Sequence, residues 1–229
     1  MSNVDPTRRQ APPEAPGKAL EGFGLSPETV VDLQRFVALL AEWQKAHNLV
    51  APGTLAEVWT RHVADSLQLL AHTPDFREWV DLGSGAGFPG LVVAIASKGQ
   101  AGKDGAQRRF TLVESNQKKA AFLRAAIRET GANASVAAER VEAHAPKVAG
   151  RADIVSARAL APLAKLLELA APYLHRGSVM LFPKGQDYVQ EVEAAAQSFD
   201  FDVVEYKSAT DSGGRVLAIG NLRPKRPRP

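Results

Sequence analysis

The sequence predicts an α/β protein with a doubly wound, mostly parallel seven-stranded sheet, one antiparallel strand and an N-terminal helical cap. Three observations support this fold class. Apolar runs alternate with helical patterns from residue 79 onward, a glycine-rich turn follows the first of these runs, and residues 25–75 show helical spacing. With 229 residues and 45% hydrophobic content, the chain is long enough to bury a full core.

The N-terminal part divides into a polar head and a helical cap. Residues 1–24 are rich in proline, glycine and charge, and we expect them to be disordered. The cap, residues 25–75, begins with a helix that has Ser26 as N-cap and Pro27 at its first position. Its apolar residues at helical spacing are Val30, Leu33, Phe36, Val37, Leu40 and Trp43. A break at Pro52 and Gly53 precedes a second helix, from Leu55 to about His72.

Residues 76–222 form the predicted sheet domain, followed by a basic Pro/Arg tail at 223–229. The expected strands are 79–82, 110–115, 134–138, 152–157, 178–183, 201–207 and 215–221, with helices between the first six. The segment Ser208–Gly214 is too short for a crossover helix, so the last two strands should pair antiparallel. This arrangement places ligands at the carboxyl ends of the parallel strands.

Residues 79–91 contain the most informative pattern, in which Gly83, Gly85 and Gly87 follow a strand that ends near Asp81. Glycines let the backbone turn sharply and approach a ligand closely. In the dinucleotide fingerprint G-x-G-x-x-G, the third glycine would stand at position 88. Here that glycine comes one residue earlier, at Gly87, and position 88 is Phe88. An aromatic ring suits a base or ribose better than a pyrophosphate. The pattern therefore resembles the first motif of S-adenosylmethionine-dependent methyltransferases.

A second signal is Glu114, at the end of the second predicted strand. A carboxylate at this strand tip can accept hydrogen bonds from both hydroxyls of a ribose. Its distance from the glycine turn exceeds the usual ~20 residues, and the polar insert at 98–109, which we expect to be a long surface loop, accounts for the excess. The alternative interpretation of Glu114 is a solvated strand end.

Composition excludes several chemistries. The chain has no cysteine, so it cannot methylate carbon 5 of a pyrimidine through a thiolate. It has no Asn-Pro-Pro-Tyr or Asp-Pro-Pro-Tyr motif for exocyclic amines, and the fourth-strand segment is 152–158. The target should therefore be an atom that is already nucleophilic. No apolar run of ~18 residues and no signal pattern occurs, and we expect a cytoplasmic protein with no membrane association and no metal site.

Taken together, the motifs resemble the glucose-inhibited division protein B family, the 16S ribosomal RNA guanine-N7 methyltransferases. The matching segments are 43–50, 61–66, 81–90, 112–124, 156–159 and 183–185. The resemblance implies a Rossmann-like class I methyltransferase that uses S-adenosylmethionine to methylate one specific guanine in the decoding-centre loop. Guanine N7 has a free lone pair and no proton to remove, so no general base is required and orientation carries the reaction. Pro183, the head and the tail depart from the family pattern.

By resemblance, the cofactor contacts fall on Gly83, Phe88, Val141, Glu142 and Arg158. Gly85, Gly87 and Glu114 join them through the turn and the strand tip. Val141 and Glu142 would border the adenine, although Glu142 could also be a surface helix residue. The planar fork of Arg158 suits the ligand carboxylate or an RNA phosphate, and a structural salt bridge is the competing interpretation.

The implied partner is 16S rRNA or the small ribosomal subunit, bound by a monomer. The net charge of +3 depends on four basic residues in the tail, without which 24 basic residues face 25 acidic ones. RNA binding should therefore use local patches, and the candidates are Arg61, His62, Lys118, Lys119, Arg124, Arg128 and Lys184. A solvated helix face could also explain Arg124 and Arg128, and His62 and Asp65 are better interpreted as cap-to-core hydrogen-bonding residues than as catalysts.

Two rival functions remain open at this level. One is a nicotinamide-dependent reductase on the same architecture, and the other is a non-catalytic RNA-binding module with a degenerate cofactor fold. Cofactor binding would distinguish the first from a methyltransferase, and methyl transfer to RNA would distinguish the second.

Overall fold

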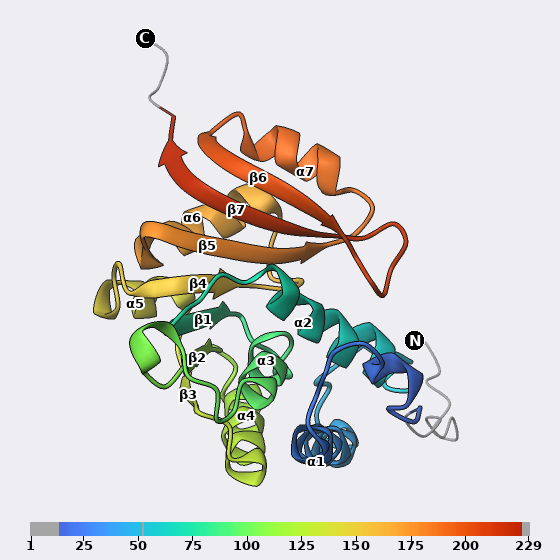
Figure 1. Cartoon of the computed structure of the whole chain (residues 1–229). Helices are drawn as coiled ribbons and strands as arrows, with labels where there is room; N and C mark the ends of the chain where they lie inside the picture. Colours follow the sequence, from blue (N-terminus) through green and yellow to red (C-terminus); the bar gives the residue numbers. More distant parts are fainter. Residues whose placement is uncertain (1–13, 52, 226–229) are drawn as a thin grey trace, which may run out of the picture.

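The computed structural model describes residues 14–51 and 53–225, and their central element is one seven-stranded sheet (Figure 1). The strands are β1 (Glu78–Leu82), β2 (Arg109–Val113), β3 (Ala134–Ala137), β4 (Ala152–Ser156), β5 (Leu174–Lys184), β6 (Phe199–Lys207) and β7 (Arg215–Pro224). Their order is β3-β2-β1-β4-β5-β7-β6, and β7 runs antiparallel to both of its neighbours. The predicted fold class is confirmed, with the antiparallel strand one position inside the edge.

Helices cover both faces of the sheet, and one lies in each of the five predicted crossovers. They are α1 (Pro27–Gln44), α2 (Asp65–Leu67), α3 (Gly90–Ala96), α4 (Gln117–Thr130), α5 (Val141–His144), α6 (Leu163–Ala170) and α7 (Tyr188–Ala195). Short 3-10 turns occur at Lys18–Leu20, Lys103–Gly105, Ala145–Lys147 and Ala171–Tyr173. A π-helical segment, Trp59–Ala64, and a 3-10 segment, Gln68–His72, flank α2.

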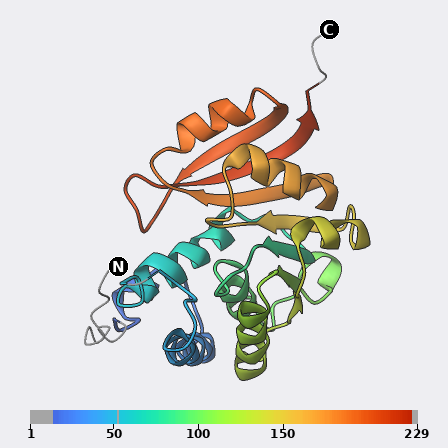
Figure 2. The ribbon, with the colours of Figure 1, turned by 180° about the vertical axis from the view of Figure 1, so that it is seen from behind.

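Alternating side chains of the strands divide the core into two layers. Trp79 packs in the layer that contains α1, α3 and α4, whereas Val80 and Leu82 pack in the layer that contains α6 and α7. Figure 2, seen from behind, shows α6 and α7 in front of the sheet. Asp81 shares the side of Trp79, which aims its carboxylate at the start of α3.

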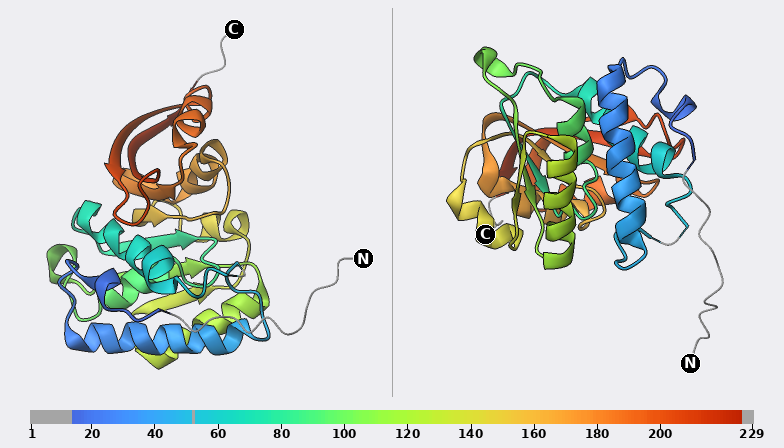
Figure 3. Two further views of the ribbon diagram at one scale, coloured as in Figure 1. Left: turned by 90° about the vertical axis from the view of Figure 1, so that its right-hand side faces the viewer. Right: turned by 90° about the horizontal axis from the view of Figure 1, so that it is seen from below.

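The cap packs directly on the sheet domain. Ser26 Oγ accepts a hydrogen bond from Thr29 N at 3.2 Å, and Pro27 occupies the first turn, as predicted for α1. Phe36 and Leu40 are fully buried in the same hydrophobic cluster as Phe122 of α4, and Figure 3 shows α1 beside α4. The division of the chain at residue 75 stays a prediction.

The second cap helix begins at Trp59, four residues later than the predicted start at Leu55. Residues 53–57 form turns instead, with hydrogen bonds from Thr54 N to Ala51 O and from Glu57 N to Thr54 O. The predicted break includes Pro52, which lies outside the described residues. The helix ends at His72 as predicted.

Both ends of the chain differ in part from expectation. Residues 1–13 and 226–229 lie outside the described residues, but residues 14–24, predicted to be disordered, follow a defined course. Glu14 N donates to Ala56 O at 2.9 Å, and Leu20 and Phe23 pack against the core. The segment is ordered because its few apolar side chains are partly buried against the hydrophobic core, although its composition is charged and rich in proline. At the other end, β7 extends to Pro224 and includes the start of the predicted tail.

The polar insert forms a loop between α3 and β2 that is tied to the body of the protein at Gly102. A Cβ at this position would come within 2.3 Å of Phe76 O, so the close approach requires glycine. Across the described residues, no helix is both long enough and apolar enough to cross a membrane.

Candidate functional site

The three glycines of the turn after β1 have positive φ angles, which produce the sharp turn that the sequence predicts. They are 65° at Gly83, 56° at Gly85 and 94° at Gly87, a region that residues with a Cβ rarely adopt. The three glycines serve different purposes. A Cβ at Gly87 would approach Leu91 Cβ to 3.0 Å, whereas at Gly85 the nearest atom is Gly83 O at 3.8 Å. Gly87 therefore allows close packing on α3, and Gly85 faces open space.

Glu114 joins the tip of β2 to this turn. Its Oε2 accepts from Gly85 N at 2.9 Å, and its Oε1 accepts from Asn116 N at 2.7 Å. Asn116 in turn caps α4 through its own side chain. Because a carboxylate offers about four lone-pair positions, each oxygen of Glu114 keeps one for a further donor. The residue is 8% exposed, so these positions lie at a sheltered strand tip.

A buried polar chain runs beneath the turn. Trp79 Nε1 donates to Ser156 Oγ at 2.8 Å, and Ser156 Oγ donates to Asp81 Oδ1 at 2.6 Å. Burial raises the pKa of Asp81 to about 6, although the bond from Ser156 opposes this shift. A Cβ at Gly90 would lie 2.7 Å from Asp81 Oδ2, so glycine is needed where α3 begins. This chain holds β1, β4 and α3 together directly below the glycine turn.

Phe88 points from the turn toward the cap rather than into open space. Its ring stacks on His62 at 4.9 Å between centroids and meets Phe36 edge-on at 5.5 Å. Only 5% of the residue is exposed. The ring forms part of a cavity wall and fixes the cap against the glycine turn.

Arg158, just beyond β4, is the main link between the sheet and the cap. Its Nη1 donates to Arg61 O at 3.0 Å and to Asp65 Oδ2 at 3.1 Å, and its Nη2 lies 2.8 Å from His62 Nδ1. The guanidinium also lies 5.3 Å from the centre of the Phe88 ring. These contacts include the structural salt bridge that is one interpretation of Arg158 from the sequence, and its role toward a cofactor or an RNA phosphate stays a prediction. The predicted hydrogen bonding of His62 and Asp65 from the cap to the core is confirmed.

His62 uses both of its ring nitrogens within the protein. Nδ1 accepts from Arg158, which cannot accept, so the proton lies on Nε2 and points to Thr54 Oγ1 at 3.0 Å. Burial and the charges of Arg158 and Arg61 lower the pKa of His62 to about 4. The ring is therefore neutral at pH 7, and neither nitrogen is free for an RNA phosphate.

Val141 and Glu142 follow β3 at the same edge of the sheet as Glu114. Glu114 N donates to Ala137 O at 3.0 Å, which sets the two strand tips side by side. Val141 is 8% exposed, and its carbonyl accepts from Tyr173 Oη at 3.0 Å. Glu142 is exposed. The structure thus brings this pair, Glu114 and the glycine turn to one edge, and their roles toward a cofactor stay predictions.

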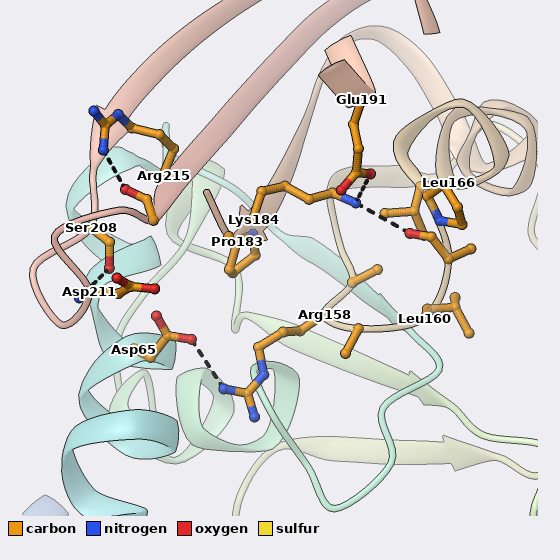
Figure 4. Close-up of a pocket in the computed structure, with 16 residues that line it drawn as sticks. Asp65, Arg158, Leu160, Leu166, Pro183, Lys184, Glu191, Ser208, Asp211 and Arg215 are labelled. Atoms are coloured by element: carbon orange, nitrogen blue, oxygen red, sulfur yellow. Dashed lines mark hydrogen bonds and ion pairs between the residues drawn. The ribbon is translucent and has the colours of Figure 1, made fainter. Parts of the chain in front are cut away.

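Two cavities open at this edge of the sheet. The larger, about 950 Å³, lies between the cap and the glycine turn and is lined by Gly83, Phe88 and Lys119 among others. The smaller, about 510 Å³, lies between the loop after β4, the end of β5 and the β6–β7 loop (Figure 4). Residues common to both linings are Asp65, Arg158, Ala159 and Asp211. Neither lining includes Gly85, Gly87, Glu114, Val141 or Glu142.

Leu160 lines the smaller cavity and packs on the glycine turn, which lines the larger one at Gly83. A Cβ at Gly83 would approach Leu160 Cδ1 to 2.7 Å, so the leucine lies directly on the glycine backbone. The preceding residue, Ala159, has a φ of 53°, in the left-handed region. The loop after β4 is held from the other side by Lys184, whose Nζ contacts Ala161 O at 3.3 Å and Glu191 Oε2 at 2.6 Å.

The basic residues predicted for RNA binding are in different environments. Lys118, Arg124 and Arg128 are exposed on α4, and no ion pair involves them in the part of the chain that the structure describes. Lys119 is half-buried and lines the larger cavity. Arg61 pairs with Glu57 at 3.2 Å on the surface. The Lys184 side chain is 9% exposed, which makes it a support for the loop after β4 rather than an open surface charge.

The site also contains residues that the sequence did not single out. Leu160 lies in no motif, and Ser156 lies in the matching segment 156–159 without a predicted role. Their roles depend on which side chain faces them across the sheet edge. Asp81 did carry a signal, because an acid precedes the glycine turn by two residues. Asp211 lies in a polar loop that the sequence marks only as a hairpin connection.

Comparisons with known proteins agree with this architecture. The family model for rRNA small subunit methyltransferase G (GidB) matches residues 29–217. Ribosomal RNA small subunit methyltransferase G of Rhizobium meliloti (strain 1021) is 47% identical over 209 residues, covering 90% of this chain and 95% of the relative. The protein of the same name from Methylobacterium nodulans is 45% identical over 205 residues, covering 90% and 94%.

Solved structures show the same fold at much lower identity. Cofactor-bound Rv0187 from MTB has a TM-score of 0.56 and 15% identity, covering 87% of this chain and 92% of that one. TYW2 of M. jannaschii, solved in complex with AdoMet, has a TM-score of 0.51 and 14% identity, covering 69% and 73%. These likenesses establish the fold, whereas the family match and the curated relatives span nearly the whole sheet and cap. The chain therefore belongs to the rRNA small subunit methyltransferase G family.

Proposed function

We propose that this methyltransferase modifies N7 of guanine-527 in the decoding-centre loop of 16S rRNA. Its methyl donor is S-adenosylmethionine, and its substrate class is small-subunit ribosomal RNA. Because the chain belongs to a methyltransferase family, the two rival hypotheses, a reductase and a non-catalytic RNA-binding module, are set aside. A ribosomal substrate would place the enzyme in the cytoplasm, and we propose that it acts as a monomer.

The observation that carries the proposal is the contact between Glu114 and Gly85. A nucleoside donor needs acceptors for its ribose hydroxyls and a backbone without side chains nearby. Glu114 keeps a lone pair on each oxygen while it holds the turn, and Gly85 leaves open space beside it. The residues present therefore fit a nucleoside. Val141 and Glu142 would border its base from the tip of β3.

The surroundings of the β4 tip support an acceptor atom that needs no general base. His62 is neutral but both ring nitrogens are engaged, and Asp65 is bound to Arg158 at 3.1 Å. Guanine N7 has no proton, so a group that orients the base is sufficient. A pyrimidine carbon or an exocyclic amine would need a thiolate or the Asn-Pro-Pro-Tyr motif, and the sequence contains neither.

RNA binding is proposed for the basic side chains on α4 together with Arg61. Lys118, Arg124 and Arg128 project outward from this helix, and Lys119 lies at the larger cavity. Phosphate contacts of this kind position an RNA without selecting its sequence, and they weaken as salt increases.

Methyl transfer to unmodified small subunits tests the proposed target. Purified enzyme is incubated with methyl-tritiated S-adenosylmethionine and with either small subunits or naked 16S rRNA from cells that lack this gene. The N7-methylguanine is then mapped by reduction and strand cleavage, which we expect at guanine-527. Label at another nucleotide would reject this target while leaving the enzyme class intact, and comparing the two substrates shows which form is used.

Substitution of Gly85 by valine tests the donor site separately. Gly85 has a φ of 56°, which a β-branched residue cannot adopt without strain, although space for a Cβ exists. We expect Gly85→Val to abolish donor binding in calorimetry and to leave the circular dichroism spectrum largely unchanged. Wild-type affinity in this variant would reject the placement of the donor.

A further inference from the structure

The smaller cavity meets the larger one at the residues that connect the sheet to the cap. Both linings include Asp65, Arg158, Ala159 and Asp211, and Gly83 lies on the larger side of this junction. We propose that the smaller cavity binds the acceptor guanine base, extruded from its RNA stack, and that Asp211 accepts hydrogen bonds from the N1–H and N2–H₂ edge of that base. This inference rests on the proposed function and assigns its base-selecting residue.

The size and walls of the cavity suit a single base. Its volume of about 510 Å³ lies within the range of sites for small molecules. Leu160, Leu166 and Pro183 provide apolar surface in the lining, against which a purine ring can pack. Figure 4 shows Asp211 beside Asp65 on the opposite side of the space from Leu160 and Leu166. An enzyme that modifies a base inside a folded RNA must take it out of the stack to reach it, and a pocket of this kind receives it.

Asp211 is the carboxylate in this cavity that is free to bind a base. Asp65 is fully engaged, since Oδ2 pairs with Arg158 while Oδ1 accepts from Gln68 Nε2 and Thr210 Oγ1. Glu191 Oε2 accepts from both Leu163 N and Lys184 Nζ. Asp211 Oδ1 accepts from Gly213 N at 2.9 Å, and within residues 14–51 and 53–225 the carboxylate has no ion pair.

The cations that line the smaller cavity are directed elsewhere. Arg158 donates to Asp65, to His62 and to Arg61 O. Arg215 donates to Gly214 O at 2.7 Å and lies over the ring of Tyr188. Lys184 pairs with Glu191. The charge of Asp211 therefore faces the cavity without a matched partner, which is the condition for binding a row of N–H donors.

The β6–β7 loop holds Asp211 at the junction by contacts with the cap. Ala209 N donates to Gln68 Oε1 at 2.9 Å, and Thr210 Oγ1 donates to Asp65 Oδ1 at 3.1 Å. Ser208 Oγ accepts from Asp211 N at 3.2 Å. The loop is thus fastened to Gln68 and to Asp65, which also pairs with Arg158, and this holds Asp211 where the two cavities meet.

A carboxylate at this position also suits the charge that moves during transfer. The N7 lone pair of guanine forms a bond to the methyl carbon as the carbon–sulfur bond breaks, and sulfur keeps that electron pair. The donor loses its positive charge, the purine gains it, and no proton moves. A carboxylate bound to N1–H and N2–H₂ interacts more strongly with the cationic purine than with the neutral one, so it favours the transition state.

The test compares Asp211→Asn with Asp200→Asn. Asp200 lies at the other end of β6, exposed and 3.6 Å from Lys225. Asparagine at 211 keeps an acceptor for Gly213 N, so the loop should stay folded. Each enzyme is assayed for S-adenosylmethionine affinity, and for kcat and KM on small subunits whose acceptor nucleotide is guanosine or inosine, which lacks the 2-amino group.

We expect Asp211→Asn to lower kcat/KM on guanosine by about 10- to 100-fold with donor affinity unchanged. The wild type should prefer guanosine over inosine, and this preference should shrink toward one in Asp211→Asn, whereas Asp200→Asn behaves like the wild type. An Asp211→Asn enzyme with the wild-type rate, or with the wild-type preference, overturns the assignment. A wild-type enzyme that methylates neither the guanosine nor the inosine subunits overturns the proposed function itself.

Discussion

The backbone amide of Gly85 donates to Glu114 Oε2 at 2.9 Å, so the carboxylate that ends β2 holds the glycine turn that ends β1. Two motifs that are 29 residues apart in the chain thereby become one site. The same carboxylate is the predicted acceptor for the donor ribose, which couples the shape of the turn to donor binding.

Glu114→Gln should weaken S-adenosylmethionine binding. The amide has one acceptor oxygen, so it cannot accept from both Gly85 N and Asn116 N and also serve two hydroxyls. Loss of a charged hydrogen bond costs about 1.5–3 kcal/mol, or roughly 10- to 150-fold in Kd. Calorimetric titration measures this effect, with the exposed Glu129→Gln as control. An affinity within about twofold of the wild type would show that Glu114 does not bind the donor.

Arg158→Lys and Asp65→Asn should each destabilise the protein and should be coupled. Lysine cannot reproduce the contacts of Arg158 with Arg61 O, Asp65 and His62 at once. The Arg158 and Asp65 side chains are 19% and 16% exposed, so each change should lower the unfolding free energy by about 1–3 kcal/mol. Denaturant unfolding of both single variants and the double variant gives the coupling energy.

A matched control for this cycle is the exposed pair of Arg61 and Glu57. Their side chains are 60% and 58% exposed, so Arg61→Lys should change stability by less than about 0.5 kcal/mol. Strict additivity of Arg158→Lys and Asp65→Asn would contradict the interpretation of Arg158 as the link between sheet and cap.

Between about pH 4 and 6, Asp81 and His62 should make the unfolding free energy depend on pH in opposite directions. Burial raises the pKa of Asp81 from 3.8 to about 6, so between these two values the folded protein holds a proton that the unfolded chain has lost. The contribution of Asp81 to stability is therefore complete below pH 3.8 and is lost as pH rises through 6. The pKa of His62 falls from 6.5 to about 4, so its contribution is complete above 6.5 and is lost as pH falls toward 4. In the wild type the two slopes partly cancel.

Single variants separate these slopes. As pH rises from about 4 to 6, the unfolding free energy of Asp81→Asn should increase relative to that of the wild type. Over the same range, the unfolding free energy of His62→Gln should decrease relative to that of the wild type. Each change should be at most roughly 3 kcal/mol, because a shift of one pKa unit corresponds to about 1.4 kcal/mol and solvent screens the partly exposed His62. Urea unfolding at a series of pH values measures both. Parallel curves for the wild type and Asp81→Asn would show that Asp81 ionises normally in the folded state.

Gly90→Ala should destabilise the start of α3, even though alanine is the better helix former. The new Cβ would lie 2.5 Å from Asp81 Cβ and 2.7 Å from Asp81 Oδ2, and Asp81 is held in β1 by Ser156. We expect a loss of about 1–3 kcal/mol in denaturant unfolding. Gly220→Ala is the control, since no atom lies within 4 Å of its Cβ position. Equal stability of the two variants would mean that α3 shifts freely away from Asp81.

Local patterns determined the order and type of the elements. Alternating apolar runs set the seven strands, and the Ser26–Pro27 pair set the start of α1, because caps and periodicity act between residues that are close in the chain. The sharp turn at the three glycines could be predicted for the same reason, since the ability to adopt a positive φ is a property of single residues. The start of the second cap helix could not be predicted in this way, because turns at 53–57 replace its first predicted residues without a strong sequence signal.

Tertiary structure alone decided what each site residue contacts. Arg158 lies just beyond β4, Asp65 and His62 belong to the cap, and Phe88 turns toward His62 and Arg158. Leu160 on Gly83 and Asp211 at the junction of two cavities likewise depend on loops that meet across the sheet edge. The sequence by itself determined the fold class and the glycine–acid motif, because these depend on local conformational preferences. The pairing of charges depended on packing between distant segments, which no local pattern encodes.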